Sequence, residues 1–222
     1  MTYSVHFGWF DIGEAEVWID PEIFYENNEA HYLVRCTIIS SPWFRLFKQM
    51  DMCFESLIRV DDLTPLKSFR DLRQGKKIDV RHDNFDYGDS ISVEAYIEDI
   101  DTHRYHKFPK SGAPLLDGLS TYLYLRSENL PALNDDLGVR TFFTNSLYEF
   151  YISPQKKGRF NLNGKKIPTA EFKLIFPPST LTPKGKSGYA VVSADERRIP
   201  LKFKVNLSLG SFSLVLEDIQ YE

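Results

Sequence analysis

The chain has 222 residues, a net charge of −4 at pH 7, and 42% hydrophobic residues, with an unusually high share of aromatic side chains. Its acidic and basic residues are interspersed, and no basic stripe is present, so the composition argues against nucleic acid as a partner. No apolar run approaches the ~20 residues that a transmembrane helix needs. A chain of this length can bury about 70% of its unfolded surface, and we expect one β-rich domain over residues 1–222.

The first hundred residues alternate between apolar and polar positions, which predicts β-strands separated by turns rich in Gly, Asn and Asp. One short helix is expected between strands, at residues 41–47, because Ser41 can cap it and Pro42 suits its first position. The strands are expected at residues 3–10, 12–20, 30–40, 49–60, 64–73, 76–85 and 90–98.

A second helix is expected at residues 114–126, where leucines and tyrosines nearly encircle the helix axis. Asp117 is placed to cap it, with Ser120 three residues further on. A helix that is apolar on most sides needs cover on most sides, and a curved sheet would supply that cover. Further strands are expected at residues 139–152, 158–163, 169–176, 188–194, 197–209 and 211–220.

The clearest strand pattern is near the C-terminus, where alternate residues from Ile199 to Leu209 are apolar and Gly210-Ser211 then reverses the chain. Short connections favour antiparallel neighbours. We therefore predict a mainly β fold, a strongly curved antiparallel meander that forms a half-barrel or barrel and wraps around one central helix. The proline-rich stretch at residues 176–183 is interpreted as a loop within this domain.

The two cysteines are expected to be free thiols. Cys36 shares its face with Val34 and Ile38 and should point inward, whereas Cys53 shares its face with Glu55. If the two strands pair without a bulge, the thiols lie on opposite faces of the sheet, where a disulfide cannot form.

Three segments carry a family resemblance. They are the opening Tyr3-Ser4-Val5-His6-Phe7-Gly8-Trp9 with Gly13-Glu14-Ala15, the helix Asp117–Arg126, and the closing Ser193–Leu201. In this order they resemble the exported bacterial proteins catalogued as domain of unknown function 3108. The resemblance implies an exported or periplasmic protein whose signal peptide is not in this chain, with no established function. The predicted architecture, a curved sheet that cradles a helix, is also similar to that of the half-barrel lipoprotein carriers of the cell envelope.

Two groups of residues could carry chemistry. His103 and His106, with Asp99 and Asp101, have the residue types of a metal site. Their segment looks like a loop and carries two cations, so a solvated loop is the preferred interpretation, and no metal or cofactor is expected. Paired carboxylates beside arginines are also found in hydrolase sites, but the Asp195-Glu196 pair lies between two strands and is interpreted as a solvated turn.

The favoured function is a non-enzymatic cell-envelope protein that binds an apolar small molecule or an envelope protein between sheet and helix. One alternative is a hydrolase that uses Asp195 and Glu196, or His103 and His106. Another is a protein or glycan interaction module that docks through exposed aromatics, namely Trp43, Phe44 and Phe47. The side chains expected to line the apolar site are Tyr3, Phe7, Trp9, Tyr122, Phe142, Tyr148, Phe150 and Phe203.

Overall fold

The structure, a computed structural model, describes residues 1–110, 112–127, 136–176, 187–207 and 210–220. The described chain is mainly β, as predicted, and no helix within it is long and apolar enough to span a membrane. It divides into two compact units. The first contains Met1–Ala15, Tyr122–Val139 and Glu149–Tyr221, and the second contains Glu16–Thr121 and Arg140–Tyr148. The prediction of one domain over residues 1–222 stays a prediction.

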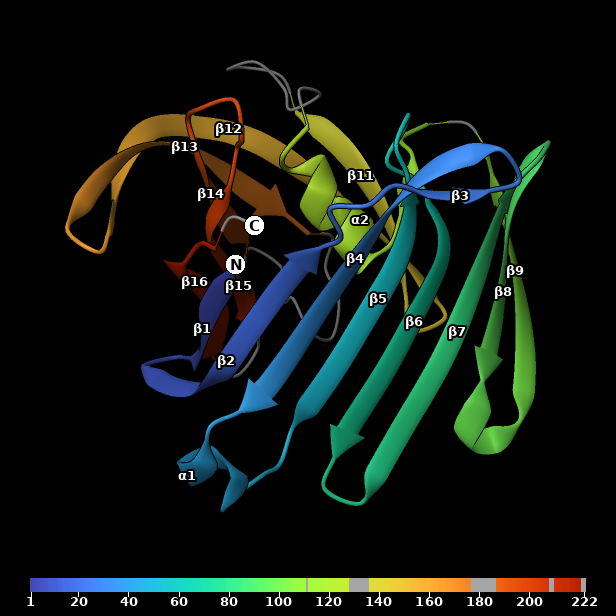
Figure 1. Cartoon of the computed structure of the whole chain (residues 1–222), viewed down its shortest axis with the longest axis horizontal. Helices are drawn as coiled ribbons and strands as arrows, with labels where there is room; N and C mark the ends of the chain where they lie inside the picture. The colour runs from blue at the N-terminus through green and yellow to red at the C-terminus, as the bar shows by residue number, and fades with distance from the viewer. Residues whose placement is uncertain (111, 128–135, 177–186, 208–209, 221–222) are drawn as a thin grey trace. The chain divides into compact units, whose positions relative to one another are not determined.

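Antiparallel strands dominate the second unit, where neighbours in the sequence are neighbours in the sheet (Figure 1). The order is β2, β4, β5, β6, β7, β8 and β9, with β3 added beside β4. The predicted meander is confirmed for β2 and for β4 to β8, whereas β3 and β9 were not predicted. The bounds are β2 Phe10–Ile19, β3 Phe24–Glu26, β4 Glu29–Ser40, β5 Asp51–Arg59, β6 Pro65–Gln74, β7 Lys77–Tyr87, β8 Ser90–Ile97 and β9 Thr102–Pro109.

Two short helical segments lie between these strands. Helix α1 (Pro42–Arg45) confirms the expected short helix with Pro42 in its first turn, but it is shorter than residues 41–47. The Ser41 side chain makes no capping hydrogen bond, so that part of the prediction is wrong. A 3-10 turn, η1 (Glu98–Ile100), joins β8 to β9. The expected position of the cysteines is also confirmed: Cys36 is buried opposite Phe54, Cys53 pairs with Thr37, and both thiols are free.

The predicted helix at residues 114–126 is shorter than expected. Helix α2 covers only Gly118–Tyr124, because Leu115 and Leu116 form a short strand, β10, that pairs in parallel with β11 (Leu137–Phe143). Within the second unit, Leu115 packs with Phe142 of β11 against the sheet, where both side chains are buried. The other members of this core cluster are Phe85, Ile91 and Val93, with Tyr87, Phe108 and Leu147 partly buried against it.

The capping of α2 is confirmed. Asp117 accepts a 2.7 Å hydrogen bond from the Ser120 backbone N–H, and the Ser120 hydroxyl accepts one of 2.7 Å from the Asp117 N–H. This reciprocal arrangement is a capping box, which satisfies two donors at the start of the helix. Asp117 is buried, and burial raises the pKa of its carboxyl group.

The single strand expected at residues 139–152 is wrong. Strand β11 ends at Phe143 and β12 (Ser146–Leu162) begins after a tight turn in which Thr144 and Asn145 both have positive φ, 51° and 59°. Two consecutive left-handed residues are typical of a hairpin turn whose twist matches that of its strands. Strand β12 is therefore longer than predicted, and it includes residues 153–157, which were left outside any predicted strand.

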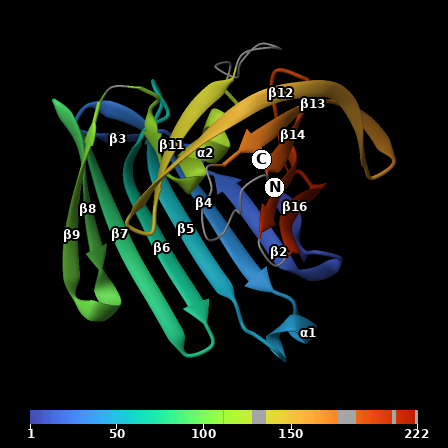
Figure 2. The ribbon, with the colours of Figure 1, turned by 180° about the vertical axis from the view of Figure 1, so that it is seen from behind.

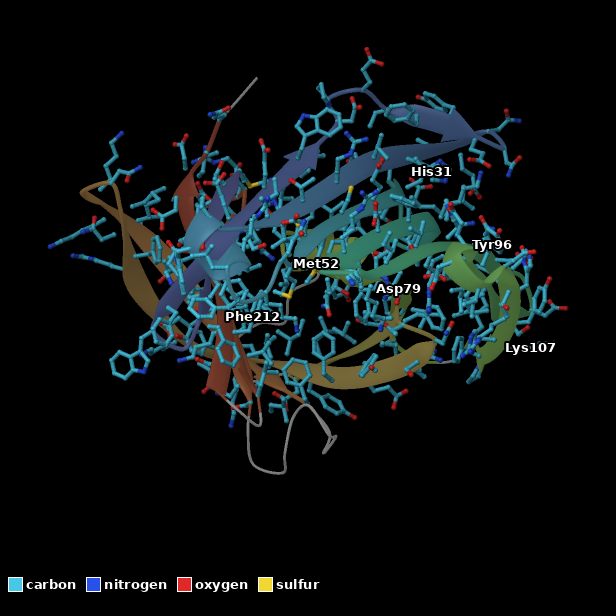
Figure 3. The ribbon with its side chains drawn as sticks, turned by 90° about the horizontal axis from the view of Figure 1, so that it is seen from below. His31, Met52, Asp79, Tyr96, Lys107 and Phe212 are labelled. Atoms are coloured by element: carbon cyan, nitrogen blue, oxygen red, sulfur yellow. The ribbon has the colours of Figure 1, made fainter. Side chains whose placement is uncertain are left out.

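In the first unit the hydrogen-bonded order is β12, β13, β14, β15, β16, β1 and β2, all antiparallel where the register is given. Figure 2 shows β12 and β13 as a long, bent hairpin. Strands β16 and β1 bring the two ends of the chain together, with Phe7 opposite Phe212 (Phe212 is labelled in Figure 3). The bounds are β1 Thr2–Phe7, β13 Lys165–Ile175, β14 Gly188–Ser193, β15 Pro200–Leu207 and β16 Gly210–Asp218.

The predicted division of β15 into a buried and a wet face is only partly correct. Leu201 is fully buried, but Phe203 and Val205 are half-buried, and so are Lys202 and Lys204 on the other face. Pro200, also on the face expected to be wet, is buried, and Lys202 lines a cavity. Residues 208–209 and the proline-rich stretch from 177 onward lie outside the described residues, so the loop interpretation is not tested.

Candidate functional site

A cavity of about 620 Å³ opens on strands β12 to β15 of the first unit. We call it the groove. It combines aromatic and aliphatic side chains with several cations and uncharged polar groups. Its lining consists of Gln155, Lys156, Arg159, Phe160, Thr169, Glu171, Phe172, Lys173, Ser187, Gly188, Tyr189, Val191, Lys202 and Asn206.

Strand register explains how distant residues meet in the groove. Lys156 of β12 lies opposite Glu171 of β13, Glu171 lies opposite Val191 of β14, and Val191 lies opposite Lys202 of β15. These four residues form one row across the strands. Directly opposite residues in such a row have Cβ atoms about 5 Å apart, so their side chains share one face.

Tyr189 belongs to the next row of the groove and is flanked by cations. It lies opposite Lys173 on one side and Lys204 on the other. The ammonium of Lys202 lies 5.8 Å from the centroid of the Tyr189 ring, within the range of a cation–π contact. The tyrosine and Lys202 are both half-buried.

The lining is strongly basic relative to the rest of the chain. It contains four cationic side chains, Lys156, Arg159, Lys173 and Lys202, and one carboxylate, Glu171. That carboxylate is 3.7 Å from the Lys156 ammonium. The whole chain has a net charge of −4, so the positive charge of the groove is a local feature and not a property of the composition.

A buried hydroxyl also lines the groove. Thr169 is 1% exposed, and its Oγ1 has no hydrogen-bond partner within the described residues. Gly158 lies opposite Thr169, and a Cβ at position 158 would be 3.1 Å from both the Thr169 hydroxyl and a Glu171 carboxylate oxygen. The glycine therefore leaves room beside this hydroxyl.

Six of the eight aromatics predicted to line an apolar site belong to the first unit. Tyr3 is buried and donates a hydrogen bond of 3.0 Å to the Pro200 carbonyl, and its hydroxyl is 2.9 Å from that of Tyr122. Phe150 is buried against Phe176, with ring centroids 5.3 Å apart. These are core positions, and they do not line the groove.

The remaining predicted lining residues are scattered. Trp9 is 98% exposed at the turn between β1 and β2, and Phe7 beside it is partly exposed. Phe203 is half-buried in β15. Phe142 and Tyr148 belong to the second unit, where Phe142 is core and Tyr148 is on the surface. The structure does not gather the eight aromatics around one described cavity.

The interpretation of residues 101–107 as a loop is wrong, because they form most of strand β9. In a strand, residues three apart point to opposite faces. His103 is exposed, with its Nδ1 2.9 Å from a Glu94 oxygen, whereas the ring of His106 packs 5.1 Å from that of Phe142 in the core. The two imidazoles do not converge, and no three potential metal-ligating side chains gather within the described part of the chain.

Asp195 and Glu196 lie in the turn between β14 and β15, as interpreted from the sequence. Asp195 accepts a 2.6 Å hydrogen bond from the Ser193 hydroxyl and forms a 2.8 Å ion pair with Arg197. The Ser193 hydrogen bond, together with Arg197, lowers the pKa of Asp195 although burial opposes the shift. A carboxylate with a lowered pKa is a poor general base near neutral pH.

Helix α1 and the turn that follows it project large apolar side chains into solvent. Trp43, Leu46 and Phe47 are 44%, 84% and 80% exposed, and Phe44 is half-buried. Arg45 anchors the segment, because its guanidinium donates to the Ser40 carbonyl at 3.0 Å and to Asp51 at 2.8 Å. The sequence prediction had included Trp43, Phe44 and Phe47 but missed Leu46.

A buried charged cluster lies between β6 and β7 of the second unit. Arg70 and Arg81 are cross-strand neighbours, and Arg70 forms a 2.9 Å ion pair with Asp79, which is labelled in Figure 3. Asp83 is 9% exposed, and burial raises its pKa to about 6, with Arg81 and Arg70 opposing the shift. None of these residues lines the groove, so we assign the cluster a structural role.

Sequence reasoning missed the groove. Its four basic residues come from three strands: Lys156 and Arg159 from β12, Lys173 from β13 and Lys202 from β15. The sequence pattern places Lys202 on the wet face of its strand, where a lysine is ordinary. One signal in the sequence could have indicated a basic groove. Lys173, Lys202 and Lys204 lie in predicted strands that also carry aromatic residues.

A family model described as "Protein of unknown function (DUF3108)" matches residues 2–217 of the chain. No curated protein and no solved structure matches it.

Proposed function

The chain belongs to the family described as Protein of unknown function (DUF3108), and from the geometry of its own residues we propose that it is a non-enzymatic binding protein. Its binding site is the groove on β12 to β15. The observation that carries this proposal is an open cavity of about 620 Å³ that places Tyr189 and Val191 beside polar groups. Ligand sites in proteins usually measure about 300–1,000 Å³ and combine an apolar lining with a few polar anchors.

This proposal keeps the binding function predicted from the sequence but moves the site. The expected position was between sheet and helix, with an aromatic lining. The groove has no residue of α2 in its lining. The finer picture, a half-barrel that wraps around one central helix, stays a prediction, and it is not needed for binding in the groove.

The hydrolase alternative has less support. It required two candidate groups to converge within hydrogen-bond reach. His103 and His106 point to opposite faces of β9, and Asp195 is held by Ser193 and Arg197 in a surface turn.

Export to the periplasm is part of the proposal and is supported by the family resemblance alone. It follows that the natural ligand or partner would be a cell-envelope molecule. Immunodetection of the protein in periplasmic and cytoplasmic fractions of its host would test the location independently of binding.

The binding proposal is tested with N-phenyl-1-naphthylamine, an uncharged aromatic probe that fluoresces in apolar sites. We expect saturable binding that is weakened at least fivefold by Tyr189→Ala, because the ring supplies the apolar surface of the groove. Tyr105→Ala removes a 75% exposed tyrosine of β9 and is the matched control. Equal binding by the wild type and both variants would contradict the groove as the site.

A second function, an interaction module, is favoured by one observation on α1. Leu46 and Phe47 are almost fully exposed on a segment that Arg45 and Asp51 hold in place. Rigid, exposed apolar side chains of this kind often mark docking sites. A photo-crosslinking residue at position 47 should capture one defined partner in the host, and capture should be lost in a Leu46→Ser background. Diffuse labelling that Leu46→Ser leaves unchanged would remove this candidate.

A further inference from the structure

The charges of the groove identify the class of ligand, an inference that rests on the proposed binding function. We infer that the groove binds an anionic amphiphile: a phosphate, sulfonate or carboxylate head attached to an aromatic or aliphatic body. The charge of the groove, the position of the cations around Tyr189, and the balance of hydrogen-bond donors and acceptors all favour such a ligand.

The groove has more cations than ion pairs. Glu171 is the one carboxylate among the lining residues, and Lys156 lies 3.7 Å from it. Arg159, Lys173 and Lys202 form no ion pair with another described residue. Three cations without counter-ions on one concave surface raise the local concentration of anions.

The cations lie beside an aromatic ring, an arrangement that suits a ligand with an anionic head and an apolar body. Lys202 is half-buried, and its ammonium is 5.8 Å from the Tyr189 ring centroid. Lys173 lies directly opposite Tyr189 in the neighbouring strand. An apolar body lying on Tyr189 and Val191 would therefore bring an attached anionic head within reach of both lysines. A partly desolvated ammonium without a carboxylate partner gains most from such an anion.

Donors outnumber acceptors among the lining side chains that remain available. Lysine and arginine only donate hydrogen bonds. The buried Thr169 hydroxyl has no partner within the described residues and can donate as well. Acceptors are fewer: Asn206 donates to the Ser187 carbonyl through its amide nitrogen and keeps only its carbonyl oxygen as an acceptor, and Glu171 already faces Lys156. Sugars and other polyols require acceptors as well as donors, so this lining suits an anion better than a neutral polar ligand.

The test compares two probes that share one skeleton. N-phenyl-1-naphthylamine is uncharged, and 8-anilino-1-naphthalenesulfonate adds a sulfonate to the same rings. We expect the sulfonate to bind the intact protein more tightly than the neutral probe at low ionic strength. We also expect this advantage to shrink as salt screens the lysines.

Variants locate the effect in the groove. Lys173→Gln combined with Lys202→Gln should weaken sulfonate binding between about twofold and thirtyfold, since each exposed charge pair contributes about 0.2–1 kcal/mol. The neutral probe should be unaffected. Lys107→Gln removes an exposed charge from β9 in the second unit and is the matched control (Figure 3). Thermal unfolding of each variant identifies any that fails to fold, and Lys202→Arg should retain the preference for the sulfonate.

The outcomes separate the inference from the proposed function. Equal affinity for both probes, with no effect of the double lysine variant, overturns the inference. The proposed function survives that result provided Tyr189→Ala still weakens the neutral probe. Inorganic sulfate is a competitor without an apolar body. If sulfate displaces the sulfonate probe at a concentration no higher than that of the probe, the site binds a free anion, and the inference that it binds an amphiphile is overturned. Binding of both probes that no groove variant alters overturns the inference and the proposed function together.

Discussion

Replacing Asp83 by Asn should change how the stability of the protein depends on pH. Asp83 lies in β7 beside Arg81 and is 9% exposed. Burial raises the pKa of its carboxyl group from 3.8 to about 6, more than the nearby arginines lower it. The folded protein therefore holds this proton more tightly than the unfolded chain does.

The magnitude follows from linkage. Each unit of difference in pKa between folded and unfolded states is worth about 1.4 kcal/mol. A rise from 3.8 to about 6 thus corresponds to roughly 3 kcal/mol of unfolding free energy. Because the folded pKa is the higher one, this contribution is fully present below about pH 4. It is lost as the pH rises through about 6.

Urea unfolding of the wild type and Asp83→Asn between about pH 4 and pH 7 measures this contribution. Unfolding free energy of the wild type should fall relative to that of the variant, by about 2–2.5 kcal/mol over this range. Asp86→Asn, at an exposed position of the same strand, is the control and should parallel the wild type. Parallel curves for Asp83→Asn and the wild type would refute the reasoning.

Three further outcomes are expected. Asp117→Ala should lower the unfolding free energy by about 2–4 kcal/mol, since it removes a helix cap and leaves buried donors of Ser120 without a partner; a change below about 0.5 kcal/mol in chemical denaturation would contradict this. A thiol reagent should modify Cys53 well before Cys36, whose burial raises its pKa to about 12, as mass spectrometry of the native protein can show. Gly158→Val should weaken probe binding, because its Cβ would lie 3.1 Å from the Thr169 hydroxyl.

The strands of the second unit could be predicted from the sequence because their pattern is local. Residues from Ser90 to Ile97 alternate strictly between buried and partly exposed positions, so a period of two identifies the strand. Strand β9 was missed because its residues are mostly charged or polar and the two that turn inward, His106 and Phe108, do not make an apolar pattern. Pairing with β8, a tertiary interaction, decides its structure.

Helix α2 shows a second reason why local sequence patterns do not determine every element. Leu115 and Leu116 fit a helical pattern as well as a strand, and the parallel pairing with Arg140 and Thr141 determines which one forms. A contact between residues 25 positions apart in the chain is not visible in local periodicity.

The groove could not be located from the sequence because its residues come together only through register. Lys156, Glu171, Val191 and Lys202 are on four different strands, and the register shifts between Val191 and Val192, before the last of the four. A slip of one residue would turn every one of these side chains to the other face. The candidates selected from the sequence were aromatic, and the structure places most of them in the core or on other surfaces.

Mapping N-phenyl-1-naphthylamine onto the protein by NMR tests the central claim most directly. Titration of the uniformly ¹⁵N-labelled protein should shift backbone amide signals of β13, β14 and β15, with the largest changes at Tyr189, Val191 and Lys202. The exposed segment around Leu46 and Phe47 should change little. Shifts concentrated at α1, or spread evenly over the chain, would contradict a binding groove on β12 to β15.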